Sequence, residues 1–217
     1  MAGKAIIVAG GVVHSADLLK ELHRGYDLLL AADSGGTVLY ELGYLPNLLI
    51  GDFDSLDGDL LAFYRAKGVE ITKFPPEKDW TDLELAVQTV INRNVQEIII
   101  YGAIGDRLDH TLGNLSLLYQ AMESGVKAVI VGLRERIFLL GPDETLTLSP
   151  TENTFFSLLP LYPGVEGVTE QGAKYPLANA SIPFGSTRGI HNEFKTGPVT
   201  ISINRGYAFV IVHTEQS

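Results

Sequence analysis

The sequence contains no cysteine, few basic residues and no long uninterrupted hydrophobic run. The absence of cysteine among 217 residues excludes a disulfide scaffold, a thiolate nucleophile and a zinc–thiolate site. Lys and Arg number 16 against 26 Asp and Glu, and the net charge of −10 argues against nucleic-acid binding because the phosphate backbone is repelled. No apolar run reaches the ~18 residues that span a bilayer, and the apolar start at residues 1–9 is too short for a signal peptide. We therefore expect a soluble, cytoplasmic protein with no membrane association.

The hydrophobic pattern changes near residue 142, and the aspartates end at Asp143. Residues 1–142 alternate short apolar runs with amphipathic stretches, which predicts a doubly wound, mostly parallel α/β sheet. Residues 143–217 have short β-branched and aromatic runs separated by Gly and Pro, which predicts a small all-β sandwich. The expected strands are 5–9, 28–32, 48–50, 69–72, 97–101 and 127–131, then 145–148, 155–160, 197–204 and 207–212; the expected helices are 16–23, 37–42, 59–66, 82–92 and 108–124.

Aspartates follow four of the predicted parallel strands, usually with glycines beside them. Ligands of an open parallel sheet bind beyond the carboxyl ends of its strands, so these side chains are expected to crowd one edge. Singly, some of them have another explanation, since Asp33, Asp79, Thr81 and Asp106 could each cap a helix. The aspartates concerned are Asp33, Asp52, Asp54, Asp79, Asp82 and Asp109.

Asp52 and Asp54 give the clearest indication of a metal site. They lie two residues apart, so both carboxylates face the same side of an extended segment. Like charges this close repel one another unless a cation joins them, and oxygen ligands on an irregular loop suit Mg²⁺. A calcium loop fits less well, because Gly58 falls one place late and Phe63 stands where a bidentate Glu is needed.

Glycines at three predicted strand-to-helix turns favour a phosphate-bearing ligand at the same edge. Gly10-Gly11, Gly35-Gly36 and Gly102 with Gly105 would let backbone amides approach an anion at a helix N-terminus. No Gly-Lys-Ser/Thr sequence follows a strand, so a Walker-type loop is absent. The cations nearest to these turns are Arg107, Lys73 and Lys78.

These segments, in this order, resemble the thiamine pyrophosphokinase family, bacterial type. The resemblance covers nearly the whole chain, although Asp106 stands where the family usually has a second Gly and His191 where bacterial members usually have Ser. The matching segments are 32–36, 51–55, 78–82 and 102–115 in the first part, and 167–177 and 189–194 in the second.

The resemblance implies transfer of pyrophosphate from Mg-ATP to the hydroxyethyl group of thiamine, giving thiamine diphosphate and AMP. It assigns residues 1–142 to ATP, Mg²⁺ and catalysis and residues 143–217 to thiamine. It also implies a homodimer with active sites at the subunit interface. A carboxylate, Asp82 or Asp54, would accept the hydroxyl proton late in the reaction.

The same resemblance implies roles for individual residues. It makes Asp52, Asp54 and Asp82 the catalytic and metal-binding carboxylates. It places ATP at Asp33, Gly35, Gly36, Gly105, Arg107 and Asp109, and thiamine at Thr81, Asp82, Tyr175 and Asn192.

Simpler explanations remain for part of this pattern. Tyr175 could be a half-packed strand residue and Asn192 a turn residue. The acidic edge alone would equally suit another Mg²⁺-dependent phosphotransferase or phosphohydrolase. A non-catalytic nucleotide or thiamine sensor is a further alternative.

Overall fold

The computed structural model describes residues 3–75, 77, 79–151 and 153–214. The chain divides into two compact units, residues 1–133 and 134–217. The second unit thus begins with strand β7 (Glu135–Leu140), which precedes the boundary expected at residue 142. β7 belongs to this unit because it pairs along its whole length, antiparallel, with β14 (Ala208–Thr214). In the described part of the chain, no helix combines the length and apolar character needed to cross a membrane.

The first unit is built on a parallel sheet with the strand order β6-β5-β1-β2-β3-β4. The inner strands are almost fully buried runs of Val, Ile, Leu and Ala, as expected where helices cover both faces of a sheet. The edge strand β4 is more exposed. The strands are β1 (Lys4–Val8), β2 (Leu28–Ala32), β3 (Leu48–Gly51), β4 (Glu70–Lys73), β5 (Glu97–Tyr101) and β6 (Lys127–Val131).

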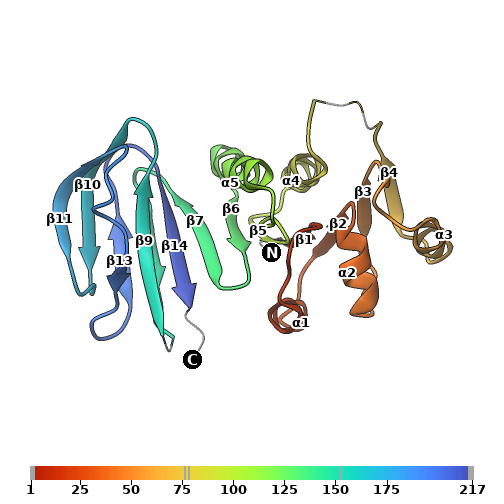
Figure 1. Cartoon of the computed structure of the whole chain (residues 1–217), viewed down its shortest axis with the longest axis horizontal. Coiled ribbons are helices and arrows are strands. Elements are labelled where there is room, and N and C mark those ends of the chain that lie inside the picture. The colour runs from red at the N-terminus through yellow and green to blue at the C-terminus, as the bar shows by residue number, and fades with distance from the viewer. Residues whose placement is uncertain (1–2, 76, 78, 152, 215–217) are drawn as a thin grey trace. The chain divides into compact units, whose positions relative to one another are not determined.

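Five helices connect these strands, and Figure 1 shows α4 and α5 on one side of the sheet and α1, α2 and α3 on the other. This arrangement confirms the predicted doubly wound α/β fold. Two helices begin at side-chain caps: Asp57 accepts from the Asp59 backbone N–H and Thr81 from that of Glu84. The helices are α1 (Ser15–His23), α2 (Gly35–Glu41), α3 (Gly58–Ala66), α4 (Asp82–Asn92) and α5 (Leu108–Glu123).

The strand order reverses between β1 and β5. From β1 the chain adds β2, β3 and β4 on one side, and then β5 and β6 on the other. The loops that leave β1 and β5 are joined by two backbone hydrogen bonds, from Gly11 N to Gly102 O (2.8 Å) and from Val12 N to Ile104 O (3.1 Å). Ligands of doubly wound sheets bind at such a reversal, so the fold itself predicts a site at this edge.

The second unit is the antiparallel sandwich that the sequence predicts. One sheet has the order β12-β9-β14-β7 and the other β11-β10-β13-β8, with a core that includes Phe156, Leu158 and Val210 from the first and Val168 and Ile201 from the second. The remaining strands are β8 (Thr145–Leu148), β9 (Thr154–Pro160), β10 (Gly164–Gln171), β11 (Leu177–Pro183), β12 (Asn192–Glu193) and β13 (Val199–Ser202).

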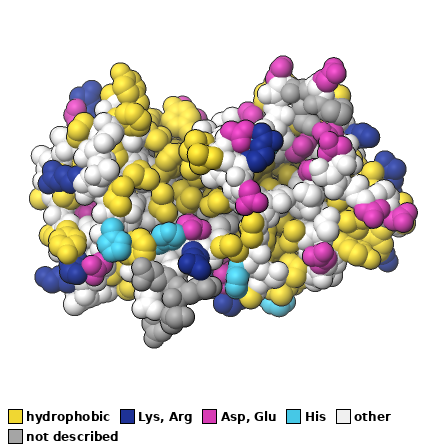
Figure 2. Space-filling view, viewed as in Figure 1, with side chains coloured by type: hydrophobic (Ala, Val, Ile, Leu, Met, Phe, Trp, Pro, Cys, Tyr) yellow, Lys and Arg dark blue, Asp and Glu magenta, His cyan; other side chains and the backbone are white. Residues whose placement is uncertain are grey.

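Charge is distributed unevenly between the two units. On the face drawn in Figure 2, acidic side chains are more frequent over the first unit than over the second. The sequence has the same bias, because every aspartate lies at or before Asp143. The first unit is therefore the one suited to bind a cation.

Candidate functional site

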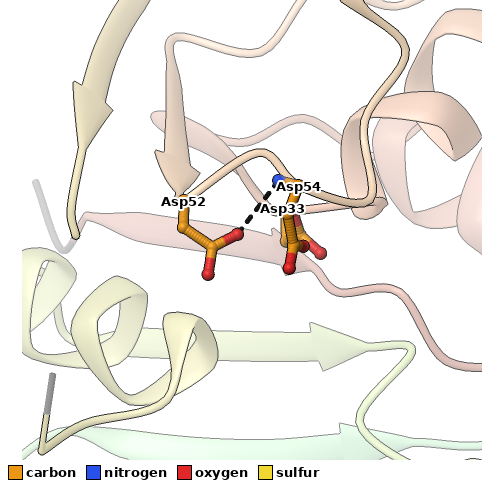
Figure 3. Close-up of side chains that lie close together, drawn as sticks. All are labelled: Asp33, Asp52 and Asp54. Carbon is orange, nitrogen blue, oxygen red and sulfur yellow. Dashed lines mark hydrogen bonds between the residues drawn. The ribbon is translucent and has the colours of Figure 1, made fainter. Parts of the chain in front are cut away.

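Three aspartates from two loops meet beyond the carboxyl ends of β2 and β3. Asp33 follows β2, and Asp52 and Asp54 follow β3. Each offers a carboxylate oxygen within 4.8 Å of the others. Figure 3 shows all three carboxylates pointing to the same side. This spacing suits several oxygens around one small divalent cation.

Strand register brings these loops together. Ala32 of β2 lies opposite Ile50 of β3, so the residues that follow leave the sheet side by side. The backbone N–H of Asp33 continues the ladder with a 2.7 Å hydrogen bond to the Ile50 carbonyl. Asp33 adopts a left-handed backbone, with φ of 48°, which Asp tolerates better than most residues.

The loop after β3 turns both of its carboxylates outward. Between them Phe53 is buried, with φ of 63°. A 3.0 Å hydrogen bond from the Asp54 backbone N–H to Asp52 Oδ1 fixes the loop, and Asp54 Oδ1 accepts from the Ser55 hydroxyl at 2.9 Å. A buried aromatic residue between two acids thus explains why Asp52 and Asp54 share a face.

The electrostatics of Asp33 favour a bound cation. Burial raises the pKa of its carboxyl, and the negative charges of Asp82, Asp52 and Asp54 raise it further, against a lowering by the Ser34 backbone N–H. Its Oδ1 is buried and accepts no hydrogen bond from the described residues. A divalent cation would provide the missing partner and offset the repulsion, so the donor set fits Mg²⁺.

Asp82, expected to be the third metal-binding carboxylate, lies beside this cluster rather than within it. It begins α4, its Oδ1 is buried, and its charge acts on Asp33. The carboxylates whose oxygens lie within 4.8 Å of one another are nevertheless those of Asp33, Asp52 and Asp54. Thr81 precedes Asp82 and caps α4 through a 3.1 Å hydrogen bond from the Glu84 backbone N–H, so its side chain has a structural task.

The glycines at this edge are needed for close packing. A Cβ on Gly35 would lie 2.0 Å from the Val8 carbonyl oxygen, and one on Gly102 would lie 2.2 Å from that of Ala9. Gly36 is buried, and its carbonyl accepts a 2.6 Å hydrogen bond from the Tyr64 hydroxyl. Gly35 and Gly36 therefore allow α2 to pack closely against the sheet, which is a structural role separate from the expected ATP binding.

The two charged residues expected at ATP near the start of α5 pair with each other. Arg107 donates to both oxygens of Asp109, with Nη2 2.6 Å and Nε 3.2 Å away. This pairing holds the pKa of Asp109 at about 2 and raises that of Arg107. Both side chains are largely exposed, as is Gly105. Lys78, another expected cation, lies outside the described residues.

In the second unit, Tyr175 and Asn192 lie together but have different environments. Tyr175 is 59% exposed. Asn192 is buried, and its side-chain amide makes four hydrogen bonds, two of them to the backbone of Tyr175. An amide has capacity for about four such bonds, so the Asn192 side chain acts here on the protein itself.

Lys174 lies over the Tyr175 ring, with Nζ 5.4 Å from the ring centroid. The ammonium is held by both oxygens of Glu193, at 2.8 and 2.9 Å, which raises the pKa of Lys174. The carboxylate offsets the positive charge beside the ring. Tyr175 therefore remains a suitable neighbour for a second, cationic group.

Sequence reasoning missed Glu170 in the same unit. Glu170 lies on β10 and is 2% exposed, and its Oε2 accepts a 2.7 Å hydrogen bond from Asn192 Nδ2. Burial raises the pKa of its carboxyl to about 7, although the Asn192 bond lowers it. The strand itself was not expected, so the alternation of inward residues that would mark Glu170 could not be seen.

Comparison with known proteins assigns both units. The model of the thiamin pyrophosphokinase catalytic domain matches residues 19–130, and the model of the thiamin pyrophosphokinase vitamin B1 binding domain matches residues 144–208. The chain belongs to the thiamine pyrophosphokinase family. The sequence resemblance and the enzyme class that it implies are thereby confirmed.

Individual members of the thiamine pyrophosphokinase family match this chain over nearly its whole length. The thiamine pyrophosphokinase of Bacillus subtilis is 30% identical over 209 residues, which are 96% of this chain and 98% of the relative. A crystal structure of thiamine pyrophosphokinase from Bacillus subtilis superimposes with a TM-score of 0.89 at 29% identity, covering 98% of this chain and 100% of that one. The structure from Geobacillus thermodenitrificans gives 0.85 at 30% identity, with 99% of each chain covered.

Proposed function

We propose that this chain transfers the pyrophosphoryl group of Mg-ATP to the hydroxyethyl group of thiamine at the acidic edge of its parallel sheet. The observation that carries the proposal is the meeting of the Asp33, Asp52 and Asp54 carboxylates within 4.8 Å, in a chain of this family. Asp82 would stand next to this set. The buried oxygen of Asp33 supports cation binding, because a cation would supply the partner that the described residues do not.

The chemistry needs positioning more than covalent catalysis. The thiamine hydroxyl attacks the β-phosphorus of ATP, and AMP leaves. A Mg²⁺ held by Asp33, Asp52 and Asp54 would neutralise phosphate charge along this path. The three carboxylates would hold that cation where it could keep the polyphosphate in line with the attacking oxygen. Asp82 lies beside the metal-binding set, at the start of α4, and we assign it the proton of the thiamine hydroxyl.

The second unit would bind the thiamine. The thiazolium ring of thiamine is a permanent cation. The exposed ring of Tyr175 can attract this cation by about 0.5–2 kcal/mol. Asn192 would act through the Tyr175 backbone, since its amide is already occupied. In the first unit, Arg107 could meet ATP phosphates if it exchanges its bonds to Asp109.

We further propose that the enzyme is a cytoplasmic homodimer, with each active site formed by the first unit of one subunit and the second unit of the other. The family resemblance motivates this assembly. Equilibrium sedimentation of the purified chain tests it. A mass of one chain at micromolar concentration, in active enzyme, would exclude the shared site.

The function is tested by incubation with ATP, Mg²⁺ and thiamine, with thiamine omitted in a parallel sample. We expect AMP and thiamine diphosphate in equal amounts, and no AMP without thiamine. Phosphate release that does not depend on thiamine would identify a hydrolase. Saturable binding without turnover in Mg²⁺, Mn²⁺ or Co²⁺ would identify a sensor.

A further inference from the structure

A buried carboxylate connects the two sheets of the second unit. Glu170 of β10 faces the sandwich core, on the same side of the strand as Val168. Its Oε2 accepts from Nδ2 of Asn192, which belongs to β12 of the other sheet. The contact is 2.7 Å long and buried. Glu170 therefore acts on β12 directly rather than on its own sheet.

Burial of this acid needs an explanation. Glu21, Glu170 and Asn192 are the buried polar or charged side chains among the described residues. Glu21 is compensated by two cations, Lys4 at 2.7 Å and Arg24 at 3.1 Å. The partner that Glu170 has in Asn192 is a neutral amide. Burying a carboxyl against a neutral partner is unfavourable compared with burying a hydrocarbon of similar size, so stability alone does not account for Glu170.

Glu170 helps to fix which way the Asn192 amide faces. The Glu170 oxygen that meets Asn192 accepts a hydrogen bond, so the NH₂ group of Asn192 faces Glu170. The amide oxygen then faces the opposite way, where it accepts from the backbone N–H groups of Tyr175 (3.1 Å) and Glu193 (2.9 Å). The second proton of the NH₂ group goes to the Tyr175 carbonyl at 2.9 Å.

The backbone of Tyr175 is thus held at both its N–H and its C=O by one side chain. The residues before Tyr175 add a backbone hydrogen bond from Lys174 N to Glu193 O at 2.8 Å and a β-bridge between Ala173 and Phe194. The Tyr175 ring itself remains largely exposed. Orientation of this ring therefore depends on its backbone, and through Asn192 on Glu170.

We propose that Glu170 is a positioning residue for thiamine, which fixes the Asn192 amide and thereby the backbone of Tyr175 under the thiazolium ring. This inference rests on the proposed function, because it takes Tyr175 as the side chain that meets thiamine. Glu170 touches neither substrate nor reacting atoms. Its burial raises the pKa of its carboxyl to about 7, in keeping with a buried acid whose hydrogen-bond partner is the neutral amide of Asn192.

Steady-state kinetics of the full chain test this role. We expect Glu170→Leu to raise the KM for thiamine on the order of tenfold, because the stacking residue loses its fixed position. The KM for ATP and kcat should change by less than about twofold, since the ATP site lies on other residues. Glu170→Gln keeps an oxygen for Asn192 and should restore the thiamine KM. Glu166→Gln, on the exposed side of the same strand, is the matched control.

A double-mutant cycle with Tyr175→Ala separates positioning from general damage. If Glu170 acts through Tyr175, adding Glu170→Leu to Tyr175→Ala should raise the thiamine KM by less than about twofold more. If Glu170→Leu does not fold, Glu170→Asp replaces it, because the shorter carboxylate keeps the charge but does not reach Asn192. The same selective rise in the thiamine KM is then expected.

Three results would overturn the inference. The first is an unchanged thiamine KM in folded Glu170→Leu, or in Glu170→Asp where that variant replaces it. The second is an equal rise of both KM values in the same variant, and the third is full additivity with Tyr175→Ala. The wild-type chain is assayed alongside, and its failure to form thiamine diphosphate would contradict the proposed function instead. Wild-type activity with any of the three overturning results removes the role of Glu170 alone.

Discussion

Asp33 combines three unfavourable features in one residue. It has a left-handed backbone, a carboxylate oxygen that is buried and accepts no hydrogen bond from the described residues, and negatively charged neighbours. Each of these costs free energy in the absence of a cation. Strain and unsatisfied polarity of this kind are typical of a binding site, and Asp33 is the residue at which the cation should have its largest effect on stability.

We expect Asp33→Asn to stabilise the metal-free protein while abolishing turnover. Asn tolerates the left-handed backbone as Asp does, so the substitution removes the charge and little else. The melting temperature without metal should rise by roughly 1–4 °C at pH 8. Because folding raises the pKa of Asp33, its ionisation destabilises the protein as pH rises, and the difference should shrink on acidification toward pH 3.8, the ordinary pKa of Asp.

Thermal unfolding with and without Mg²⁺, at both pH values, measures this effect. Asp143→Asn is the matched control, because Asp143 is also left-handed, with φ of 63°, but is exposed and remote in sequence from the cluster. A lower melting temperature in Asp33→Asn than in wild type at pH 8 would contradict the prediction.

Asp54→Ala should lower kcat by on the order of 10²–10³-fold with little change in the metal-free melting temperature. Asp54 is exposed, and its removal relieves repulsion with Asp52 and Asp33, so no stabilising contact of the core is lost. Assays of AMP formation together with calorimetry provide the test, with the exposed Asp59→Asn as control. Retained activity combined with a large fall in melting temperature would refute a metal role for Asp54.

At the scale of elements, α4 presents Asp82 to the acidic edge. Thr81 caps the start of the helix, because its hydroxyl accepts a hydrogen bond from the Glu84 backbone N–H. Farther along, the Glu84 side chain accepts a 2.9 Å hydrogen bond from Gln120 of α5, which ties the two helices together. The position of Asp82 therefore depends on a capped and braced helix start rather than on a free loop.

Thr81→Ala should reduce the free energy of unfolding by about 1 kcal/mol, because the Glu84 N–H loses its cap. Thr81→Ser retains the hydroxyl and should keep most of the stability. Urea denaturation of the three proteins at one pH measures the difference. Equal midpoints for the Ala and Ser variants would show that the cap contributes nothing.

At the scale of the whole molecule, stability should depend on pH because folding shifts the pKa values of two buried acids in opposite directions. The pKa of Glu21 is lowered by Lys4 and Arg24, so its contribution is lost on acidification. Glu170 behaves oppositely, since its pKa rises from 4.5 to about 7. Its contribution is fully present below pH 4.5 and is lost as pH rises through about 7.

We therefore expect Glu170→Gln to become more stable relative to wild type as pH increases from 5 to 8, by at most about 3 kcal/mol. Chemical denaturation across this range measures the difference in unfolding free energy. Glu166→Gln, with an exposed carboxylate, should run parallel to wild type. If the unfolding free energies of Glu170→Gln and wild type also changed with pH in the same way, the pKa of Glu170 would not differ between the folded and unfolded states.

Five elements agree with the sequence prediction at both ends, namely β2, β5, β6, β8 and α4. Their signals are local: continuous apolar runs for the buried strands, and an apolar period behind a capping Thr for the helix. β7, β10, β11 and β12 were missed. β10 contains two glycines and two glutamates, and its pairing with β11 has register shifts, so no simple alternation marks it.

The site was predictable in part. Asp33, Asp52 and Asp54 were expected at one edge because each follows a parallel strand. Asp82 as a metal ligand and Asn192 at thiamine stay predictions. The structure adds that Asp33, Asp52 and Asp54 form the set within 4.8 Å, and that Asn192 makes four hydrogen bonds within the protein. Motif spacing does not encode such distances of a few ångströms.

The sequence by itself determined the fold class, the family and the loops that carry the acids, because hydrophobic period and motif order are local properties of the chain. The tertiary structure decided which carboxylates converge and which polar groups are used up internally. The alignment of β2 with β3 brings Asp33 to Asp52 and Asp54, and sandwich packing brings Glu170 to Asn192. Both depend on contacts between residues distant along the chain, which only folding brings together.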